Sequence, residues 1–92
     1  MFTIGGAMAK RVKPLSMPIQ QGPLEAKELG EFVRARRTQA GMGIHETAAF
    51  CGVAVDTLTK IEKALGDVQL SSVLKVCRML GIVLKVEPWD EK

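Results

Sequence analysis

Residues 44–63, IHETAAFCGVAVDTLTKIEK, constrain the fold of this chain more than any other stretch. Apolar residues recur three apart on both sides of a central glycine, and these are Ala48 and Cys51 before it and Leu58 and Ile61 after it. Intervals of three and four residues are helical, and the few residues between the two segments leave room only for a short turn. The stretch therefore predicts two short helices joined at the glycine.

This pair of helices has two interpretations. A small helix, a turn at Gly52 and a second helix with polar positions between its apolar ones make the helix-turn-helix arrangement, whose second helix enters the major groove of DNA. The same spacing fits an ordinary pair of short core helices equally well. The flanking segments must therefore decide between the two.

A longer helix is predicted upstream, from Pro23 to about Ala40. Proline suits the first helical position because its missing N–H is no loss there, and Gly41 supplies the stop. The apolar face of this helix contains Leu29, Phe32 and Val33. Arg37 falls nearer the buried side, where a guanidinium without an acidic partner is costly, so we expect a carboxylate to meet it.

The chain is short enough for one small domain, whose last helix is predicted over residues 70–80 and ended by Gly81. The inward residues of this helix are expected to be Leu70, Val73, Leu74, Cys77 and Leu80. We expect an N-terminal arm over 1–22, a helix-turn-helix domain over 23–81, a dimerisation strand over 82–87 and a C-terminal tail over 88–92.

The strand is predicted from the alternation in IVLKVE, which places Ile82, Leu84 and Val86 on one side. A lone strand is not stable in water. Its partner is either the same strand of a second copy, which gives an antiparallel ribbon in a homodimer, or residues 15–19 of the arm from either subunit.

Both ends of the chain leave alternatives open. Proline and glycine punctuate the arm, which is expected to be extended and flexible. Its basic cluster of Lys10, Arg11 and Lys13 either lies beside a phosphate backbone or forms a solvated tail. Beyond the strand, Trp89 is either a lid over the dimer core or an exposed anchor for another protein.

Composition limits the remaining function classes. With 47% hydrophobic and 25% charged residues the chain should fold, and its net charge of +3 permits a polyanionic partner without requiring one. Cys51 and Cys77 stand in apolar helical patterns, with no CxxC motif and a single histidine in the chain, which predicts reduced thiols and no metal site. No stretch approaches the roughly 20 apolar residues of a membrane span, and the start lacks signal-peptide features. We therefore expect a soluble, cytoplasmic protein that is no enzyme and holds no cofactor.

With these elements in order, residues 29–80 resemble the Cro/C1-type (XRE-like) helix-turn-helix family. The matching stretches are LGEFVRARRTQAG, ETAAFCGVAVDTLTKIE and LSSVLKVCRMLGI. The resemblance implies an all-α, five-helix, lambda-repressor-like domain, and it supplies Glu62 as the partner of Arg37. The short C-terminal strand is similar to that of the HipB-type antitoxins, small dimeric repressors. That likeness implies two roles, binding of a palindromic operator upstream of the protein's own gene and inhibition of a HipA-type kinase toxin.

The resemblance also implies the residues that face DNA. The base-reading positions are Ala54, Val55, Asp56, Thr57, Thr59 and Lys60, and the phosphate-contacting candidates are Arg34, Arg36 and Lys63. Lys60 can reach guanine O6 or N7, whereas the carboxylate of Asp56 either accepts from a cytosine amine or is repelled by phosphates.

Two departures from the family pattern weaken this site. Gly43 and Ile44 stand where the family often has a capping residue and a glutamine, so neither side chain can bond a phosphate, although the free N–H groups of the helix still could. Asp56 adds a negative charge where the duplex is most negative. The alternatives to an antitoxin are therefore a protein-interaction module of the same fold with weak or lost DNA readout and an orphan XRE-type regulator.

Overall fold

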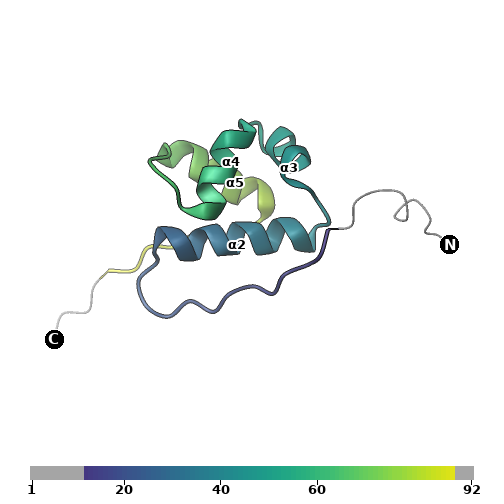
Figure 1. The fold of residues 1–92 in the computed structure, drawn as a ribbon. Helices are drawn as coiled ribbons and strands as arrows, with labels where there is room; N and C mark the ends of the chain where they lie inside the picture. Colours follow the sequence, from purple (N-terminus) through teal and green to yellow (C-terminus); the bar gives the residue numbers. More distant parts are fainter. Residues whose placement is uncertain (1–11, 89–92) are drawn as a thin grey trace.

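The computed structural model describes residues 12–88, which fold into a small helical bundle with an extended segment at each end (Figure 1). Its helices are α2 (Ala26–Gln39), α3 (Ile44–Cys51), α4 (Val55–Lys63) and α5 (Leu70–Leu80). This range contains four helices and no strand, so the all-α prediction is confirmed, whereas the resemblance implied five helices. The predictions for Lys10, Arg11 and Trp89 concern residues outside the described range.

The long helix α2 lies along one side of the bundle, where α4 and α5 pack against it, and α3 packs on α4 and α5 (Figure 1). It begins later than predicted. Gly22 and Pro23 form a bend, with Gly22 at φ +109°, and Glu25 is still extended at the position that precedes the helix. The prediction that Pro23 opens the helix is therefore wrong, because the chain is still turning there.

A single apolar core joins the four helices. Its buried members are Val33, Ala48, Cys51, Leu58, Ile61, Val76, Cys77 and Leu80. The prediction for α5 is partly wrong, since Leu70 is 68% exposed and Leu74 is 40% exposed, while Val76 is fully buried. The side of α5 that packs into the core contains Val76, Cys77 and Leu80. The two exposed leucines lie beside it on the same helix.

Two helices approach each other closely at Gly30 of α2. A Cβ atom at this position would lie 2.5 Å from the carbonyl oxygens of Ile61 and Glu62. Glycine therefore allows α2 to contact the backbone of α4 directly, at a distance that no other residue permits.

The turn between α3 and α4 is tight. Gly52 ends α3 in the left-handed conformation with φ +73°, and its N–H bonds to the carbonyl of Ala49. The Nζ atom of Lys75 on α5 donates to the carbonyl oxygen of Gly52 at 3.3 Å. The turn is thus fixed both by the backbone of glycine and by a cation at the negative end of α3.

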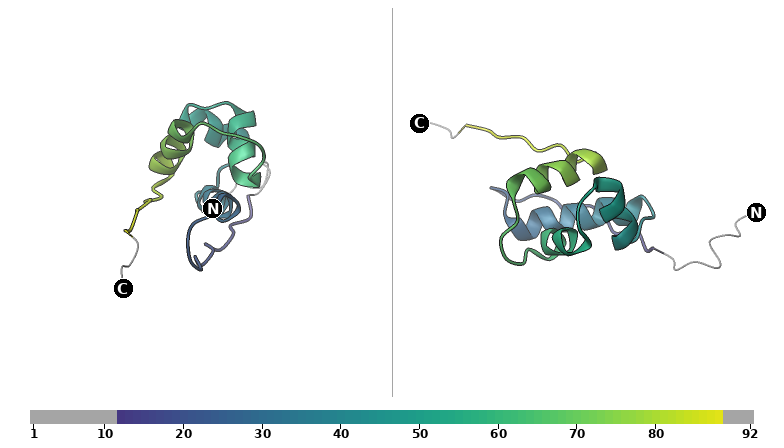
Figure 2. Two further views of the ribbon diagram at one scale, coloured as in Figure 1. Left: turned by 90° about the vertical axis from the view of Figure 1, so that its left-hand side faces the viewer. Right: turned by 90° about the horizontal axis from the view of Figure 1, so that it is seen from above.

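The arm from Val12 to Gln21 runs back along α2 to the point where that helix begins (Figure 1). The backbone N–H of Leu15 donates to Thr38 Oγ1 at 3.0 Å, and Gln39 Nε2 donates to the carbonyl oxygen of Leu15 at 2.7 Å. Within one chain the arm thus bonds to α2 and forms no backbone hydrogen bond with residues 82–88. Those residues leave the end of α5 and extend beyond the helices (Figure 2).

The Gly30→Ala variant should lose more than about 3 kcal/mol of unfolding free energy, because the added methyl group forces two backbones apart where overpacking alone costs about 1–3 kcal/mol. Urea denaturation measures the change. The matched control is Gly43→Ala, since a Cβ there would meet nothing within 4 Å. Equal stability of the two variants would show that α2 and α4 do not meet at Gly30.

Candidate nucleic-acid interface

One side of helix α4 packs against the bundle, and the other side is exposed to solvent. Leu58 and Ile61 are buried in the core, and Asp56 and Lys63 are exposed. The base-reading candidates divide into two groups: Ala54 and Asp56 are exposed, and Val55, Thr57, Thr59 and Lys60 are partly exposed. All six therefore retain some surface at the beginning and the outer side of α4.

The orientation of α4 depends on an ion pair between Arg37 of α2 and Glu62 of α4. Arg37 Nε and Nη2 donate to the two carboxylate oxygens of Glu62 at 2.7 Å and 3.0 Å. The third donor, Nη1, bonds to the carbonyl oxygen of Met42 at 3.0 Å. The side chains are only 11% and 6% exposed. One guanidinium thus holds together α2, the end of α4 and the loop that leads into α3.

Asp56 and Lys60 form an ion pair of their own on the outer side of α4. Lys60 Nζ lies 3.2 Å from Asp56 Oδ2, one helical turn away, and both side chains are substantially exposed. Such a pair is worth about 0.3–0.5 kcal/mol, so it opens readily when another acceptor approaches. The i, i+4 spacing of the two residues is visible in the sequence and is the signal that could have indicated this pair.

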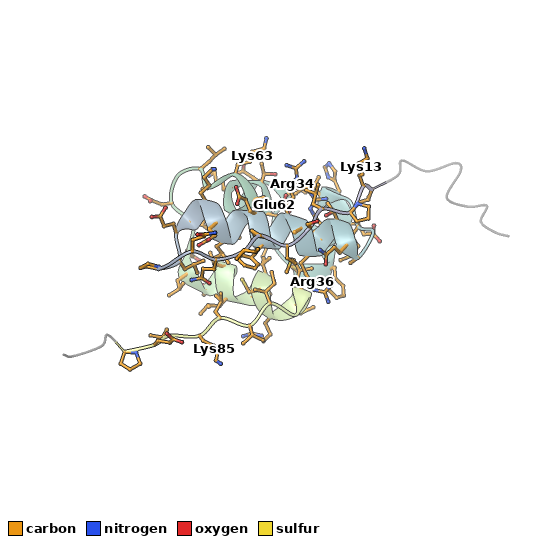
Figure 3. The ribbon with its side chains drawn as sticks, turned by 90° about the horizontal axis from the view of Figure 1, so that it is seen from below. Lys13, Arg34, Arg36, Glu62, Lys63 and Lys85 are labelled. Atoms are coloured by element: carbon orange, nitrogen blue, oxygen red, sulfur yellow. The ribbon has the colours of Figure 1, made fainter. Side chains whose placement is uncertain are left out.

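The candidate phosphate contacts do not share one face. Arg34 and Lys63 lie on the side of the molecule that carries α4, whereas Arg36 points toward α5 (Figure 3). Arg36 Nε donates to the carbonyl oxygen of Leu80 at 3.0 Å, at the C-terminal end of α5. Arg36 therefore lies apart from the other two candidates, and its contact with phosphate stays a prediction. Its partner, a backbone carbonyl 44 residues away, could not be identified from the sequence.

At the other helix of the pair, α3 begins at Ile44 after Gly43, and no side chain caps it. The first backbone N–H groups of a helix have no partner within it and carry partial positive charge. At this end of α3, a phosphate could therefore be bound by backbone N–H groups.

Three further observations concern metal ligands, the cysteines and the lengths of the helices. In the range 12–88 no three His, Cys, Asp or Glu side chains gather as metal ligands would. Burial raises the pKa values of the Cys51 and Cys77 thiols, which keeps both protonated and poorly nucleophilic. The helices of the described part are too short and too polar for any of them to cross a membrane.

The sequence model of the helix-turn-helix domain matches residues 28–85, which is more than half of the chain. The protein belongs to this helix-turn-helix family. Among solved structures, one titled "MDT Protein" superposes with a TM-score of 0.64 and 18% identity, over 77% of this chain and 100% of that one. That likeness shows the fold alone. No curated protein matches the sequence.

Family membership assigns roles to the two central helices. In a helix-turn-helix domain the second helix of the pair is the DNA recognition helix, and the first crosses the backbone. Here α3 and α4 are that pair, with Gly52 in the turn. The interpretation as an ordinary pair of core helices is thereby excluded.

Replacing Glu62 with alanine should cost about 3–5 kcal/mol of unfolding free energy, because Arg37 would remain nearly buried without a carboxylate. Chemical denaturation measures this loss. Glu31→Ala is the control, since its pair with Lys27 is exposed and should be worth well under about 1 kcal/mol. If the two variants lost the same small amount, the ion pair between Arg37 and Glu62 would not be what orients α4.

Proposed function

We propose that this helix-turn-helix protein is a sequence-specific transcriptional repressor that binds a palindromic operator as a homodimer and regulates its own gene as a HipB-type antitoxin. The observation that carries the proposal is the fixed presentation of α4. A nearly buried ion pair orients it, and two cations, Arg34 and Lys63, lie on the same side of the molecule (Figure 3).

Repression would follow from occupancy of the promoter. Two recognition helices, one from each subunit, enter successive major grooves about 34 Å apart. Phosphate contacts by Arg34 and Lys63 position each subunit, and the residues at the start of α4 read base edges. Lys60 can exchange the carboxylate of Asp56 for guanine O6 or N7, since their ion pair is weak.

The Lys60→Ala variant should bind its operator more weakly by about 1–3 kcal/mol, because it loses the strongest base-reading side chain of α4. Fluorescence anisotropy with the protein's own upstream DNA measures the change. Lys27→Ala is the matched control: it removes the same charge from an equivalent i, i+4 ion pair on α2. Operator affinity equal to that of the Lys27 variant would remove Lys60 as a base reader.

The C-terminal segment supports the homodimer. Residues 82–88 and the first half of α2 border an open groove of about 850 Å³, whose apolar lining includes Leu24, Leu29 and Phe32. Val86 is 96% exposed and Val83 is 79% exposed. An extended apolar segment with unpaired backbone groups invites another strand. We propose that the same segment of a second copy, through Ile82, Leu84 and Val86, forms the antiparallel ribbon.

Deleting the chain from Ile82 onward should convert dimers to monomers in analytical ultracentrifugation. Because Ile82 also packs on the core, the Val86→Asp variant tests the interface without disturbing the fold. Its charge should weaken the dimer strongly, since the side chain is exposed in the single chain and would be covered in the ribbon. Dimers that persist in both variants would place the interface elsewhere.

We propose a HipA-type kinase toxin as the protein partner, on the basis of the resemblance alone. Measuring the kinase activity of the toxin with and without this protein tests that partnership. An orphan regulator would repress its operator but inhibit no kinase. The alternative of a protein-interaction module is favoured by two residues. Ile44 has no side-chain group that can bond a phosphate, and the carboxylate of Asp56 is repelled by phosphates.

DNA titrations at two salt concentrations separate the module from the repressor. Tight binding to the protein's own upstream DNA that weakens steeply with salt supports the repressor, because several phosphate contacts release counterions. Weak and equal binding to a scrambled duplex supports the module.

A further inference from the structure

The arm is anchored to the last turn of α2 at Leu15, and near its other end the N–H of Gln21 donates to Glu28 Oε2 at 3.3 Å. Leu15 is bonded on both sides of its backbone, with its N–H on Thr38 Oγ1 and its carbonyl oxygen on Gln39 Nε2. Thr38 is 6% exposed, and its hydroxyl donates in turn to the carbonyl oxygen of Ala35 at 3.0 Å. A buried threonine in the last turn of α2 thus holds the arm in place.

The residues just before this anchor are conformationally restricted. Pro14 has a fixed φ near about −65°, and a residue that precedes proline is confined to the extended region. Lys13 is therefore an extended residue two positions before a fixed point, a distance of at most about 7 Å along the chain. Its backbone loses little further freedom when its ammonium group binds something.

Lys13 points to the side of the molecule where Arg34 and Lys63 lie, away from Arg36 and Lys85 (Figure 3). Lys13, Arg34 and Lys63 are all exposed. None of these three side chains forms an ion pair with another residue of the range 12–88. They come from three separate segments, the arm, α2 and α4. Exposed cations from separate segments on the side of the recognition helix suit a polyanion that extends beyond a single helix.

We propose that the arm is a second DNA-contacting element, in which Lys13, positioned by the anchor of Leu15 on Thr38, binds a backbone phosphate beside the groove that α4 enters. This inference rests on the proposed DNA-binding function and adds a contact site outside the helix-turn-helix pair. The contact carries no sequence information, because it is made to phosphate. It should strengthen binding to any duplex.

The test measures the affinity of the full chain, over a series of salt concentrations, for its own upstream DNA and for a scrambled duplex of equal length. The slope of log affinity against log salt falls by about 0.9 for each phosphate that the protein no longer neutralises. Lys13→Ala should therefore reduce the slope by about 1.8 for a dimer, on both duplexes. Lys27→Ala removes the same charge from an exposed ion pair in the first turn of α2, outside the proposed dimer and DNA contacts, and should leave the slope unchanged.

A second pair of variants tests the anchor. Thr38→Val removes the acceptor of the Leu15 N–H and should reduce both affinity and slope toward those of Lys13→Ala, whereas Thr38→Ser keeps the hydroxyl and should restore both. If the arm only covers α2, the Thr38→Val variant should have a lower unfolding midpoint but an unchanged salt slope, and this result would contradict the inference.

The following results overturn the inference. If Lys13→Ala retains the full slope, or if Lys27→Ala reduces it equally, the arm makes no contact of its own, while the proposed repressor still stands. Failure of the unaltered chain to bind either duplex refutes both proposals together.

Discussion

The structure depends first on the contact between α2 and the last turn of α4. Arg37 and Glu62 are nearly buried there, and each would be an uncompensated charge without the other. Gly30 allows the two backbones to touch at the same end of α4, since a side chain there would meet carbonyl oxygens at 2.5 Å. The helix that would enter DNA is therefore fixed by an electrostatic requirement and a steric one acting together.

The same contact explains how cations are divided over the surface. Arg37 donates hydrogen bonds to Glu62 and to the carbonyl oxygen of Met42, and Arg36 donates one to the carbonyl oxygen of Leu80 at the end of α5. Arg34 lies on the side of α4 and pairs with no carboxylate of residues 12–88 (Figure 3). Three arginines within four positions thus have three different roles, because successive positions of a helix point in different directions.

The two extended segments relate to α2 differently. The arm is fastened at Leu15 to the last turn of α2, so its conformation is set within one chain. The C-terminal segment borders the first half of the same helix across an open groove and keeps Val86 exposed. One segment already has its partner, whereas the other has backbone and apolar surface that a second copy could cover.

The sequence by itself determined the helix-turn-helix pair, the glycine stop at Gly81 and the need of Arg37 for a carboxylate, because helical periodicity, glycine and buried charge are local signals. Only the tertiary structure decided which stripe of α5 is buried, where α2 begins and that Arg36 faces α5. Each of those outcomes depends on what another segment places nearby: the core selects Val76 over Leu70, and the carbonyl of Leu80 selects Arg36. Periodicity shows that a helix has an apolar side, but the neighbouring helices decide how far around it that side extends.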